Sequence, residues 1–276
     1  MKDILFLATV WLMSQHLFSQ EIIKINSEYI NNETPILVQK PSDYSQSKKY
    51  PVAYMLHGYS ENYTQWSKTT DLQKLANDYQ MILVCPEGFT TYYLNGTGGR
   101  PQYEHFFFDE LVPLVHRKYK VDSKNIFITG LSMGGYGALS LFIKHPEYFN
   151  TAASTSGALE IDFENFKNIS NLFFENERMT NDLKHHLGNP SDNDWNRFSI
   201  SNLLEQHPDF KKGFFLDCGL QDPLLENTLK IKELALSKEL PIRFAIQRGG
   251  HNTEYWSQSI VYHFVYFKQH LNQDEL

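Results

Sequence analysis

One serine of the chain stands in a setting that suits nucleophilic catalysis. Residues 126–134 read Ile-Phe-Ile-Thr-Gly-Leu-Ser-Met-Gly, so an apolar stretch leads into a glycine-flanked turn with Ser132 at its centre. We expect a strand, a tight turn and then a helix from about Gly135. This is the sequence form of a nucleophile elbow, in which a strained turn exposes the serine hydroxyl. Gly130 and Gly134 stand where a Cβ would collide across such a turn.

The pentapeptide alone is a weak signal, because chance places Gly-x-Ser-x-Gly in roughly one chain in ten or twenty of this length. The flanking residues strengthen it, since apolar strand formers precede it and small residues follow, which would let a helix pack closely on a sheet. The alternative is an idle serine in a tight turn. In the elbow, the amide of Met133 lies at a helix N-terminus, where its N–H and the helix dipole can stabilise an oxyanion.

A serine nucleophile needs a base, and histidine is the usual one because its pKa lies near the working pH. His251 follows a predicted strand, residues 242–246, in a loop with two glycines just before the last predicted helix. We expect His251 to be the base, the alternative being a capping or surface role. Six other histidines fall on predicted helices or in a segment that we interpret as an insertion: His145, His263, His270, His185, His186 and His207.

The base in turn needs an acid that fixes its tautomer. Asp222 follows the predicted strand at residues 214–218 and would therefore lie in a loop at the same edge of the sheet. Asp217 is the rival, although it falls within the strand. Asp222 precedes a proline and could also cap a helix, and both roles are compatible. The order serine, aspartate, histidine is that of the α/β-hydrolases.

Two further sets of residues complete the predicted site. The second oxyanion donor should come from the loop after the strand at 52–56, and we expect it to be the backbone amide of Tyr59, with His57 in a structural role. A second loop could line the substrate cleft, or it could simply be an exposed aromatic loop; its candidate residues are Tyr92, Tyr93 and Asn95.

The predicted elements alternate between strand and helix, which favours a mostly parallel sheet with helices on both faces. We therefore predict a single α/β-hydrolase domain over residues 21–276, with an antiparallel ribbon at 21–30 and 34–40 on one edge. Residues 159–212 break the alternation and are predicted to form a helical insertion over the active site. The other predicted elements are strands at 81–85 and 151–154 and helices at 71–79, 103–119, 224–237 and 254–270.

Composition limits the classes of partner. The 276 residues carry a formal charge of −7, which argues against nucleic acid and acidic membranes as partners.

The first 20 residues resemble a secretory signal peptide, with a buried N-terminal helix as the alternative, so we expect a secreted or periplasmic protein without a membrane anchor. Cys85 and Cys218, the only cysteines, each follow or end a predicted core strand and are expected to be buried free thiols.

With these residues located, the chain resembles the esterase D family of α/β-hydrolases. That family includes S-formylglutathione hydrolases, feruloyl and acetylxylan esterases, tributyrin-type esterases and the mycolyl-transferring antigen 85 proteins. The resemblance covers roughly residues 30–270. It rests on Tyr50-Pro51-Val52, Leu56-His57-Gly58, Asn62, Trp66, Pro86-Glu87-Gly88, Glu110-Leu111-Val112-Pro113, Gly130-Leu131-Ser132-Met133-Gly134-Gly135-Tyr136-Gly137-Ala138, His145-Pro146, Ser156-Gly157, Gly219-Leu220-Gln221-Asp222 and Gly250-His251.

The resemblance implies a carboxylic ester hydrolase without metal or cofactor. It assigns the nucleophile, acid and base to Ser132, Asp222 and His251, and the oxyanion amides to Tyr59 and Met133. The chain departs from the formylglutathione hydrolases after Gly58, where Tyr-Ser-Glu-Asn replaces their cysteine-containing loop. Together with the predicted signal peptide, this favours an exported esterase.

By analogy with that family, we expect the substrates to be small-acyl or aryl esters, with acetyl or feruloyl esters of carbohydrates foremost. Four other interpretations remain open at this point. They are an acyltransferase of the antigen 85 type, a thioesterase like the S-formylglutathione hydrolases, a serine peptidase, and a catalytically inactive relative that binds carbohydrate.

Overall fold

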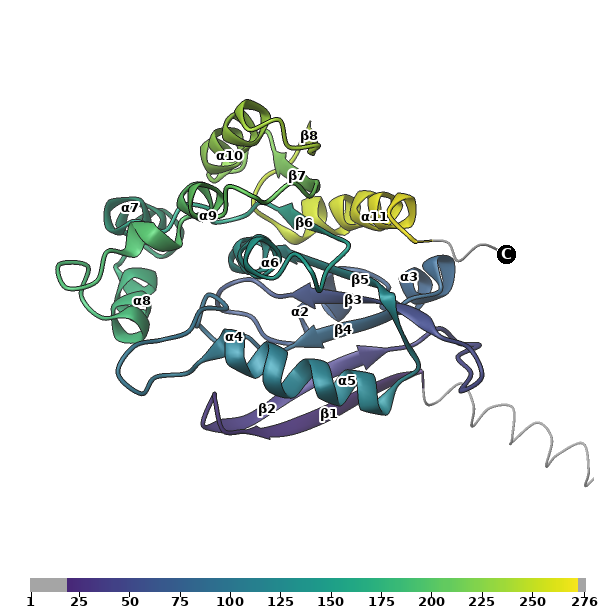
Figure 1. The fold of residues 1–276 in the computed structure, drawn as a ribbon. Helices are drawn as coiled ribbons and strands as arrows, with labels where there is room; N and C mark the ends of the chain where they lie inside the picture. Colours follow the sequence, from purple (N-terminus) through teal and green to yellow (C-terminus); the bar gives the residue numbers. More distant parts are fainter. Residues whose placement is uncertain (1–18, 273–276) are drawn as a thin grey trace, which may run out of the picture.

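The computed structural model describes residues 19–272, and the predicted signal peptide lies outside this range except for its last two residues. One eight-stranded sheet runs through the described part, in the order β1-β2-β4-β3-β5-β6-β7-β8. The ribbon predicted at the edge is confirmed, because β1 pairs antiparallel with β2, and β2 with β4, whereas the remaining pairs are parallel (Figure 1). The strands are β1 (Gln20–Ser27), β2 (Asn32–Gln39), β3 (Tyr50–Leu56), β4 (Ile82–Pro86), β5 (Val121–Leu131), β6 (Thr151–Thr155), β7 (Phe214–Gly219) and β8 (Arg243–Gln247).

Helices cover both faces of this sheet, as expected for an α/β-hydrolase. The larger apolar core lies between one face and helices that include α5 and α6, and the smaller core lies between the other face and α2, α3 and α11. The helices are α2 (Gln65–Thr69), α3 (Leu72–Tyr79), α4 (Tyr103–His105), α5 (Val112–Lys118), α6 (Met133–Lys144), α7 (Phe163–Phe174), α8 (Arg178–Leu187), α9 (Ile200–Gln206), α10 (Leu225–Ser237) and α11 (Thr253–Gln269).

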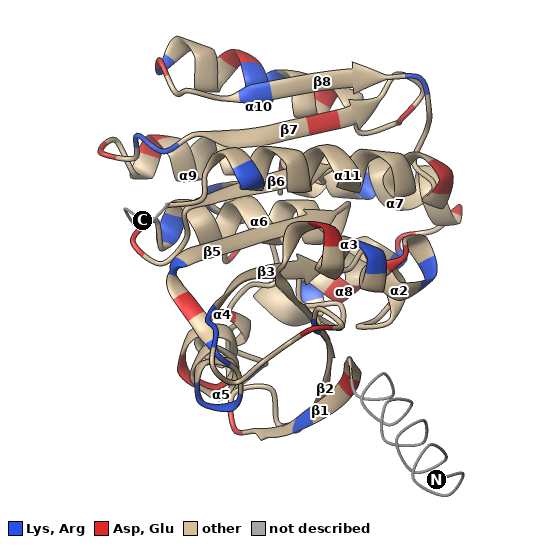
Figure 2. Cartoon of the chain, turned by 90° about the vertical axis from the view of Figure 1, so that its right-hand side faces the viewer, with Lys and Arg blue, Asp and Glu red and all other residues tan. Residues whose placement is uncertain are grey.

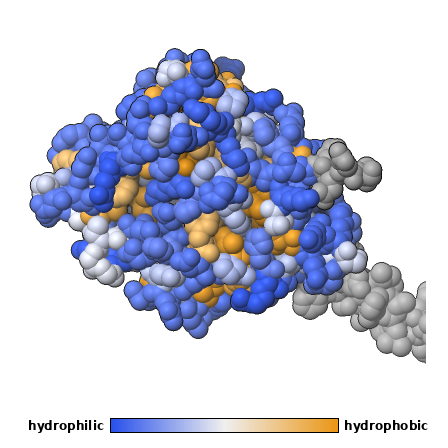
Figure 3. All heavy atoms as spheres, in the orientation of Figure 1, coloured by the Kyte–Doolittle hydropathy of each residue, from blue (hydrophilic) through white to orange (hydrophobic). Residues whose placement is uncertain are grey.

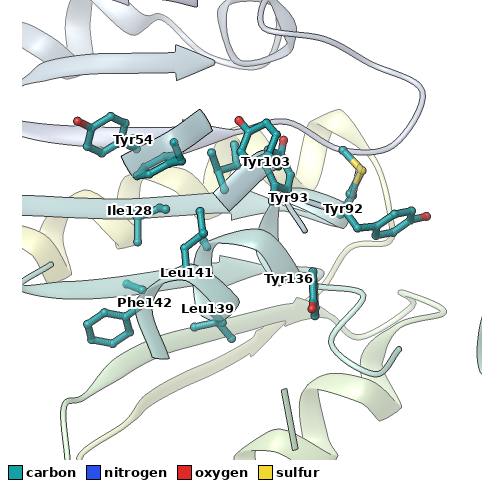
Figure 4. Packing of buried hydrophobic residues seen from close by; sticks show 14 of the residues in the cluster. Tyr54, Tyr92, Tyr93, Tyr103, Ile128, Tyr136, Leu139, Leu141 and Phe142 are labelled. Carbon is teal, nitrogen blue, oxygen red and sulfur yellow. The ribbon is translucent and has the colours of Figure 1, made fainter. Parts of the chain in front are cut away.

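The central strands are buried on both faces, and β3 and β4 are accordingly almost wholly apolar. In β3, Tyr54 contributes to the larger core while its neighbours Ala53 and Met55 contribute to the smaller one. Figure 4 shows Tyr54 and Ile128 of β3 and β5 on the side that faces helix α6. The predicted elbow between β5 and α6 therefore follows a strand that is packed on both sides of the sheet.

The helix predicted at residues 103–119 is interrupted. The predicted long helix is present over residues 103–118, but it consists of α4, a π-helical segment η1 (Phe106–Leu111) and α5, so its middle is not α-helical. The amide of Val112 bonds to the carbonyl of Phe107, five residues earlier. This change of register comes directly before Pro113, which has no N–H to donate to an α-helical carbonyl.

Residues 159–212, here called the insertion, contain α7, α8, a short 3₁₀ helix η2 (Trp195–Phe198) and α9. The carboxylate of Asp162 accepts the backbone N–H of Asn165 and so caps the start of α7. In Figure 1, α7, α8 and α9 lie together at one end of the sheet. The insertion is therefore helical, as predicted, although its sequence as a whole shows little helical periodicity.

Charged residues of both signs are distributed over the fold. In the cartoon of Figure 2, acidic and basic positions are interspersed along the elements, and in Figure 3 hydrophilic residues dominate the visible face, with apolar ones in smaller spots. None of the helices in residues 19–272 is both long and apolar enough to cross a membrane. Cys85 and Cys218 are buried free thiols, as expected.

Candidate active site

Ser132 occupies the turn between β5 and α6, and its backbone has the form of the predicted elbow. Its φ of 53° and ψ of −117° place its backbone in a region that residues other than glycine rarely adopt. A Cβ on Gly130 would overlap the carbonyl of Gly134, and a Cβ on Gly134 would overlap the carbonyl of Leu56. The helix begins at Met133, two residues earlier than predicted, so the turn leads directly into it.

His251 lies in the loop between β8 and α11, and its side chain contacts residues of two other loops at the same edge of the sheet. Its Nε2 atom is 3.0 Å from Oγ of Ser132, and its Nδ1 atom is 3.1 Å from each carboxylate oxygen of Asp222. The imidazole also contacts two aromatic rings, with centroids 4.7 Å away at Phe173 and 5.0 Å away at Trp256. The structure therefore brings the three residues that we predicted into one hydrogen-bonded chain.

Asp222 is well placed to remain ionised beside the imidazole. Its burial alone would raise the pKa, but the hydrogen bond and charge of His251, with further bonds from Ser156 and the backbone of Leu224, lower the pKa below its ordinary value. The Leu224 amide donates to Oδ1 of Asp222 over 2.8 Å, so the carboxylate also orders the turn that leads into α10. The helix cap considered for Asp222 is not formed, because α10 begins at Leu225 with Leu224 as its N-cap and without a capping side chain.

The loop after β3 passes close to Ser132. A Cβ on Gly58 would be 3.5 Å from Cβ of Ser132, and the Gly58 amide donates to Oε1 of Gln65 over 2.7 Å. Tyr59 follows in the wall of the same pocket. Met133 is the first residue of α6, so its N–H has no acceptor within that helix. These two amides are the candidates for an oxyanion hole.

His57 is buried beside this loop and makes only structural contacts. Its Nδ1 atom is 2.8 Å from the carbonyl of Gly58, and its Nε2 atom accepts the amide of Gly88 over 2.7 Å. Glu87 lies 3.2 Å from the same Nε2. With both ring nitrogens engaged away from Ser132, His57 connects the β3 and β4 loops, as the sequence suggested.

The expectation that Tyr92, Tyr93 and Asn95 line the substrate cleft does not fit the structure. Both tyrosines are fully buried, and none of the three residues lines the pocket at Ser132. The Tyr93 hydroxyl donates to the carbonyl of His57, and the side-chain oxygen of Asn95 accepts the amide of Glu104. The aromatic composition suggested a binding loop, but the interior of the larger core takes up these rings, some of which Figure 4 shows.

A small pocket of about 100 Å³ opens at Ser132 and is mostly apolar. Four of its lining residues come from α7 and α8, and the sequence analysis did not identify them. A signal was present in the spacing of Phe166, Ile169 and Phe173, three and four residues apart, which is that of one helix face. The lining residues are Gly58, Tyr59, Gln65, Leu131, Ser132, Ala158, Ile169, Phe173, Phe174, Met179, Leu224, His251 and Trp256.

The arrangement can support nucleophilic acyl chemistry. A hydroxyl within hydrogen-bond reach of an imidazole, itself oriented by a buried carboxylate, is the general form of an activated serine. Within residues 19–272, no group of three or more histidine, cysteine, aspartate or glutamate side chains is arranged to hold a metal ion. Proton transfer through His251 is the chemistry that these side chains can perform.

Comparison with known proteins decides the family. The Esterase family model matches residues 27–276, which is nearly the whole chain. The chain belongs to this family. This confirms the resemblance and the enzyme class expected from the sequence, a serine esterase among the carboxylic ester hydrolases.

Individual relatives agree with that assignment. An acetyl esterase of Caldicellulosiruptor saccharolyticus is 26% identical over 265 residues, which are 90% of this chain and 98% of the relative. An endo-1,4-beta-xylanase/feruloyl esterase of Xylanibacter ruminicola is 30% identical over 124 residues, or 41% of this chain and 17% of that protein. The solved structure of the fluorophosphonate-binding serine hydrolase FphF of Staphylococcus aureus superposes with a TM-score of 0.76 at 23% identity, covering 90% of this chain and 98% of its own, which confirms the fold.

Proposed function

We propose that this esterase is exported and hydrolyses small-acyl or aryl esters of carbohydrates, acetyl and feruloyl esters foremost, through an acyl-enzyme on Ser132. One observation carries the mechanistic part, namely the hydrogen-bonded chain from Ser132 through His251 to Asp222 at the mouth of an apolar pocket. The proposal of export rests on the signal-like sequence of the first 20 residues.

In the first half of the reaction, His251 accepts the hydroxyl proton of Ser132 through Nε2 as Oγ attacks the ester carbonyl. The imidazolium is stabilised by the ionised Asp222 on its Nδ1 side. The negative charge that develops on the carbonyl oxygen is accepted by the backbone N–H groups of Tyr59 and Met133. His251 then gives its proton to the departing alcohol, which leaves Ser132 acylated.

In the second half, a water molecule takes the place of the alcohol. His251 removes a proton from this water as it attacks the acyl carbon, and the same two amides accept the second oxyanion. Collapse of the intermediate returns the proton to Ser132 Oγ and releases the acid. An alcohol that replaced water here would make the enzyme an acyltransferase, which is why added acceptors belong in the assay.

The substrate class is supported by the pocket and by the relatives. Apolar side chains from the insertion line the pocket beside Ser132, and such a lining suits an acyl or aryl group better than a charged one. The names acetyl esterase and feruloyl esterase, carried by two relatives, point to carbohydrate esters of these acids. We therefore propose that the acyl group binds in the pocket and that the alcohol lies outside the pocket, on the solvent side of Ser132.

The test is hydrolysis of a matched panel by the wild-type protein and Ser132→Ala. The panel contains 4-nitrophenyl acetate, butyrate and octanoate, methyl ferulate and acetylated xylan, each with and without a sugar alcohol as acceptor. We expect activity that disappears in the variant and favours acetyl or feruloyl esters. Equal rates in the two proteins would refute the acyl-enzyme, and activity confined to the octanoate would refute the small-acyl preference.

A further inference from the structure

The phenol ring of Tyr59 is enclosed by side chains from the insertion, whereas its backbone lies in the loop beside Ser132. The hydroxyl donates a hydrogen bond of 2.5 Å to Oδ2 of Asp182 on helix α8. The guanidinium of Arg178, one turn earlier on the same helix, lies 5.3 Å from the centroid of the Tyr59 ring. Phe174 at the end of α7 meets the ring edge-on with centroids 5.5 Å apart.

The other side of the ring is also occupied. Tyr92 stacks on Tyr59 with centroids 6.0 Å apart and planes inclined by 27°, and Tyr92 in turn contacts Phe166 of α7. Tyr92 is fully buried, and its hydroxyl has no hydrogen-bond partner among the described residues. Its role here is packing. The Tyr59 phenol is therefore held by one hydrogen bond, one cation–π contact and two aromatic contacts.

The backbone of this loop is held more firmly before Tyr59 than after it. The Gly58 N–H donates to Oε1 of Gln65 over 2.7 Å, and the Gly58 carbonyl, which shares a peptide plane with the Tyr59 N–H, lies 2.8 Å from Nδ1 of His57. After Tyr59, Ser60 has a φ of 65°, which is unfavourable for a serine, and the amide of Glu61 makes only a long bond of 3.4 Å to the carbonyl of Gly58. The anchored side chain of Tyr59 is therefore a second constraint on this peptide, and it acts from the side where the backbone is held less firmly.

We propose that Asp182 and Arg178 are positioning residues for the oxyanion hole: by fixing the Tyr59 side chain they aim its backbone N–H at the oxygen of the substrate. This inference rests on the proposed function, because it assigns Tyr59 the oxyanion role. Burial and the hydrogen bond to Asp182 raise the pKa of the Tyr59 phenol, so it stays protonated and remains a donor at neutral pH.

The arrangement also makes catalysis depend on the insertion. Phe174 lines the pocket and touches Tyr59, so one helix end takes part in both acyl binding and the anchoring of Tyr59. Asp182 and Arg178 do not line the pocket. Loss of either side chain should therefore lower kcat while KM for a small ester changes little.

Three variants test the hydrogen bond: Asp182→Asn, Tyr59→Phe and the two combined. Asp192→Asn is the matched control, because Asp192 belongs to the same insertion but is exposed, and within residues 19–272 its carboxylate accepts a hydrogen bond only from Ser191. Removing an oxyanion donor outright costs about a hundredfold or more in kcat. We expect each single variant to lose roughly tenfold in kcat by partial misalignment, with KM within twofold of the wild type.

The combined variant should lose no more than the worse single variant, since both changes act on the same hydrogen bond, which Asp182→Asn weakens by removing the charge of the acceptor and Tyr59→Phe removes. Single variants within twofold of the control, losses that multiply, or a rise of KM at unchanged kcat would each overturn the proposal. If Asp182→Asn does not fold, Tyr59→Phe tests the same bond without a change of charge.

Amide hydrogen exchange of the segment 57–66 provides a readout that does not need activity. We expect faster exchange at this segment in Asp182→Asn and Tyr59→Phe than in Asp192→Asn, and equal exchange would overturn the proposal. Should the wild-type protein prove inactive on every ester, the proposed function fails, and the exchange comparison still decides whether the insertion fixes this loop.

Discussion

The imidazole of His263 lies against the carboxylate of Asp217 in the interior, with Nε2 2.5 Å from Oδ2. The other ring nitrogen is 2.6 Å from the hydroxyl of Thr129. The other carboxylate oxygen of Asp217, Oδ1, accepts hydrogen bonds from three hydroxyl groups, those of Thr155, Tyr255 and Ser259. The aspartate that rivalled Asp222 in the sequence thus has a separate function, which is to join α11 to the central strands.

This separation predicts opposite phenotypes for two aspartate-to-asparagine changes. Asp217→Asn leaves a fully buried network with mismatched donors, and breaking such a buried pair costs about 3 kcal/mol or more of unfolding free energy. Asp222→Asn should lower kcat by roughly 10³ to 10⁴ because the imidazole loses its orientation and its counter-charge. Urea unfolding and kcat on 4-nitrophenyl acetate measure both. A larger loss of kcat in folded Asp217→Asn than in Asp222→Asn would mean that Asp217 is the catalytic aspartate and that Asp222 has the structural role.

The elbow makes a prediction about stability. In Gly130→Ala the new methyl group would overlap the Gly134 carbonyl, and backbone atoms cannot move aside as a flexible side chain would. We expect a loss of about 3 kcal/mol or more, or insoluble protein. Gly250→Ala is the control, since its nearest neighbour would be 3.6 Å away, and it should change the unfolding free energy by less than about 1 kcal/mol. Equal denaturant midpoints for the two variants would contradict this explanation of the elbow.

The elbow and the loops that carry Asp222 and His251 could be predicted because local sequence determines them. A glycine-flanked serine after an apolar strand has few structural solutions, and loops after parallel strands meet at one edge of the sheet. The pocket wall could not be predicted, because Ile169 and Met179 face Ser132 only through the packing of α7 on α8. Tyr92 and Tyr93 were misjudged for the same reason, since composition does not reveal which rings the core will bury.

Glu104 supplies a prediction about pH. Burial would raise the pKa of this carboxyl, but hydrogen bonds and charges from His145 and Lys144 lower it from 4.5 to about 2. A carboxyl with a lowered pKa in the folded state stabilises the fold above its unfolded pKa, and the contribution is lost as the pH falls from about 4.5 towards 2. Glu104→Gln should therefore cost up to about 3 kcal/mol at pH 7.

The gap between Glu104→Gln and the wild type should shrink by more than half when urea unfolding is repeated at pH 3. Asp78→Asn is the control, because its ion pair with Lys74 is exposed and should contribute less than about 1 kcal/mol at either pH. A gap that stayed constant between pH 7 and pH 3 would mean that Glu104 acts through packing and not through its charge.

The last prediction concerns the acyl pocket and uses two positions on one helix. Ile169 is buried in the wall of the pocket, whereas Leu172, one turn later on α7, is 61% exposed. Ile169→Ala removes three carbon atoms from the wall, at a cost of about 2 kcal/mol or more in stability. The enlarged pocket should accept longer acyl chains, and one or two methylenes are worth about 1–3 kcal/mol in such a site. We therefore expect the ratio of kcat/KM for 4-nitrophenyl butyrate over acetate to rise roughly tenfold in Ile169→Ala and to stay within twofold in Leu172→Ala. A ratio that does not move in Ile169→Ala would place the acyl chain outside this pocket and leave the pocket to the alcohol, because the two groups of an ester bound at Ser132 must lie on different sides of the attacked carbon.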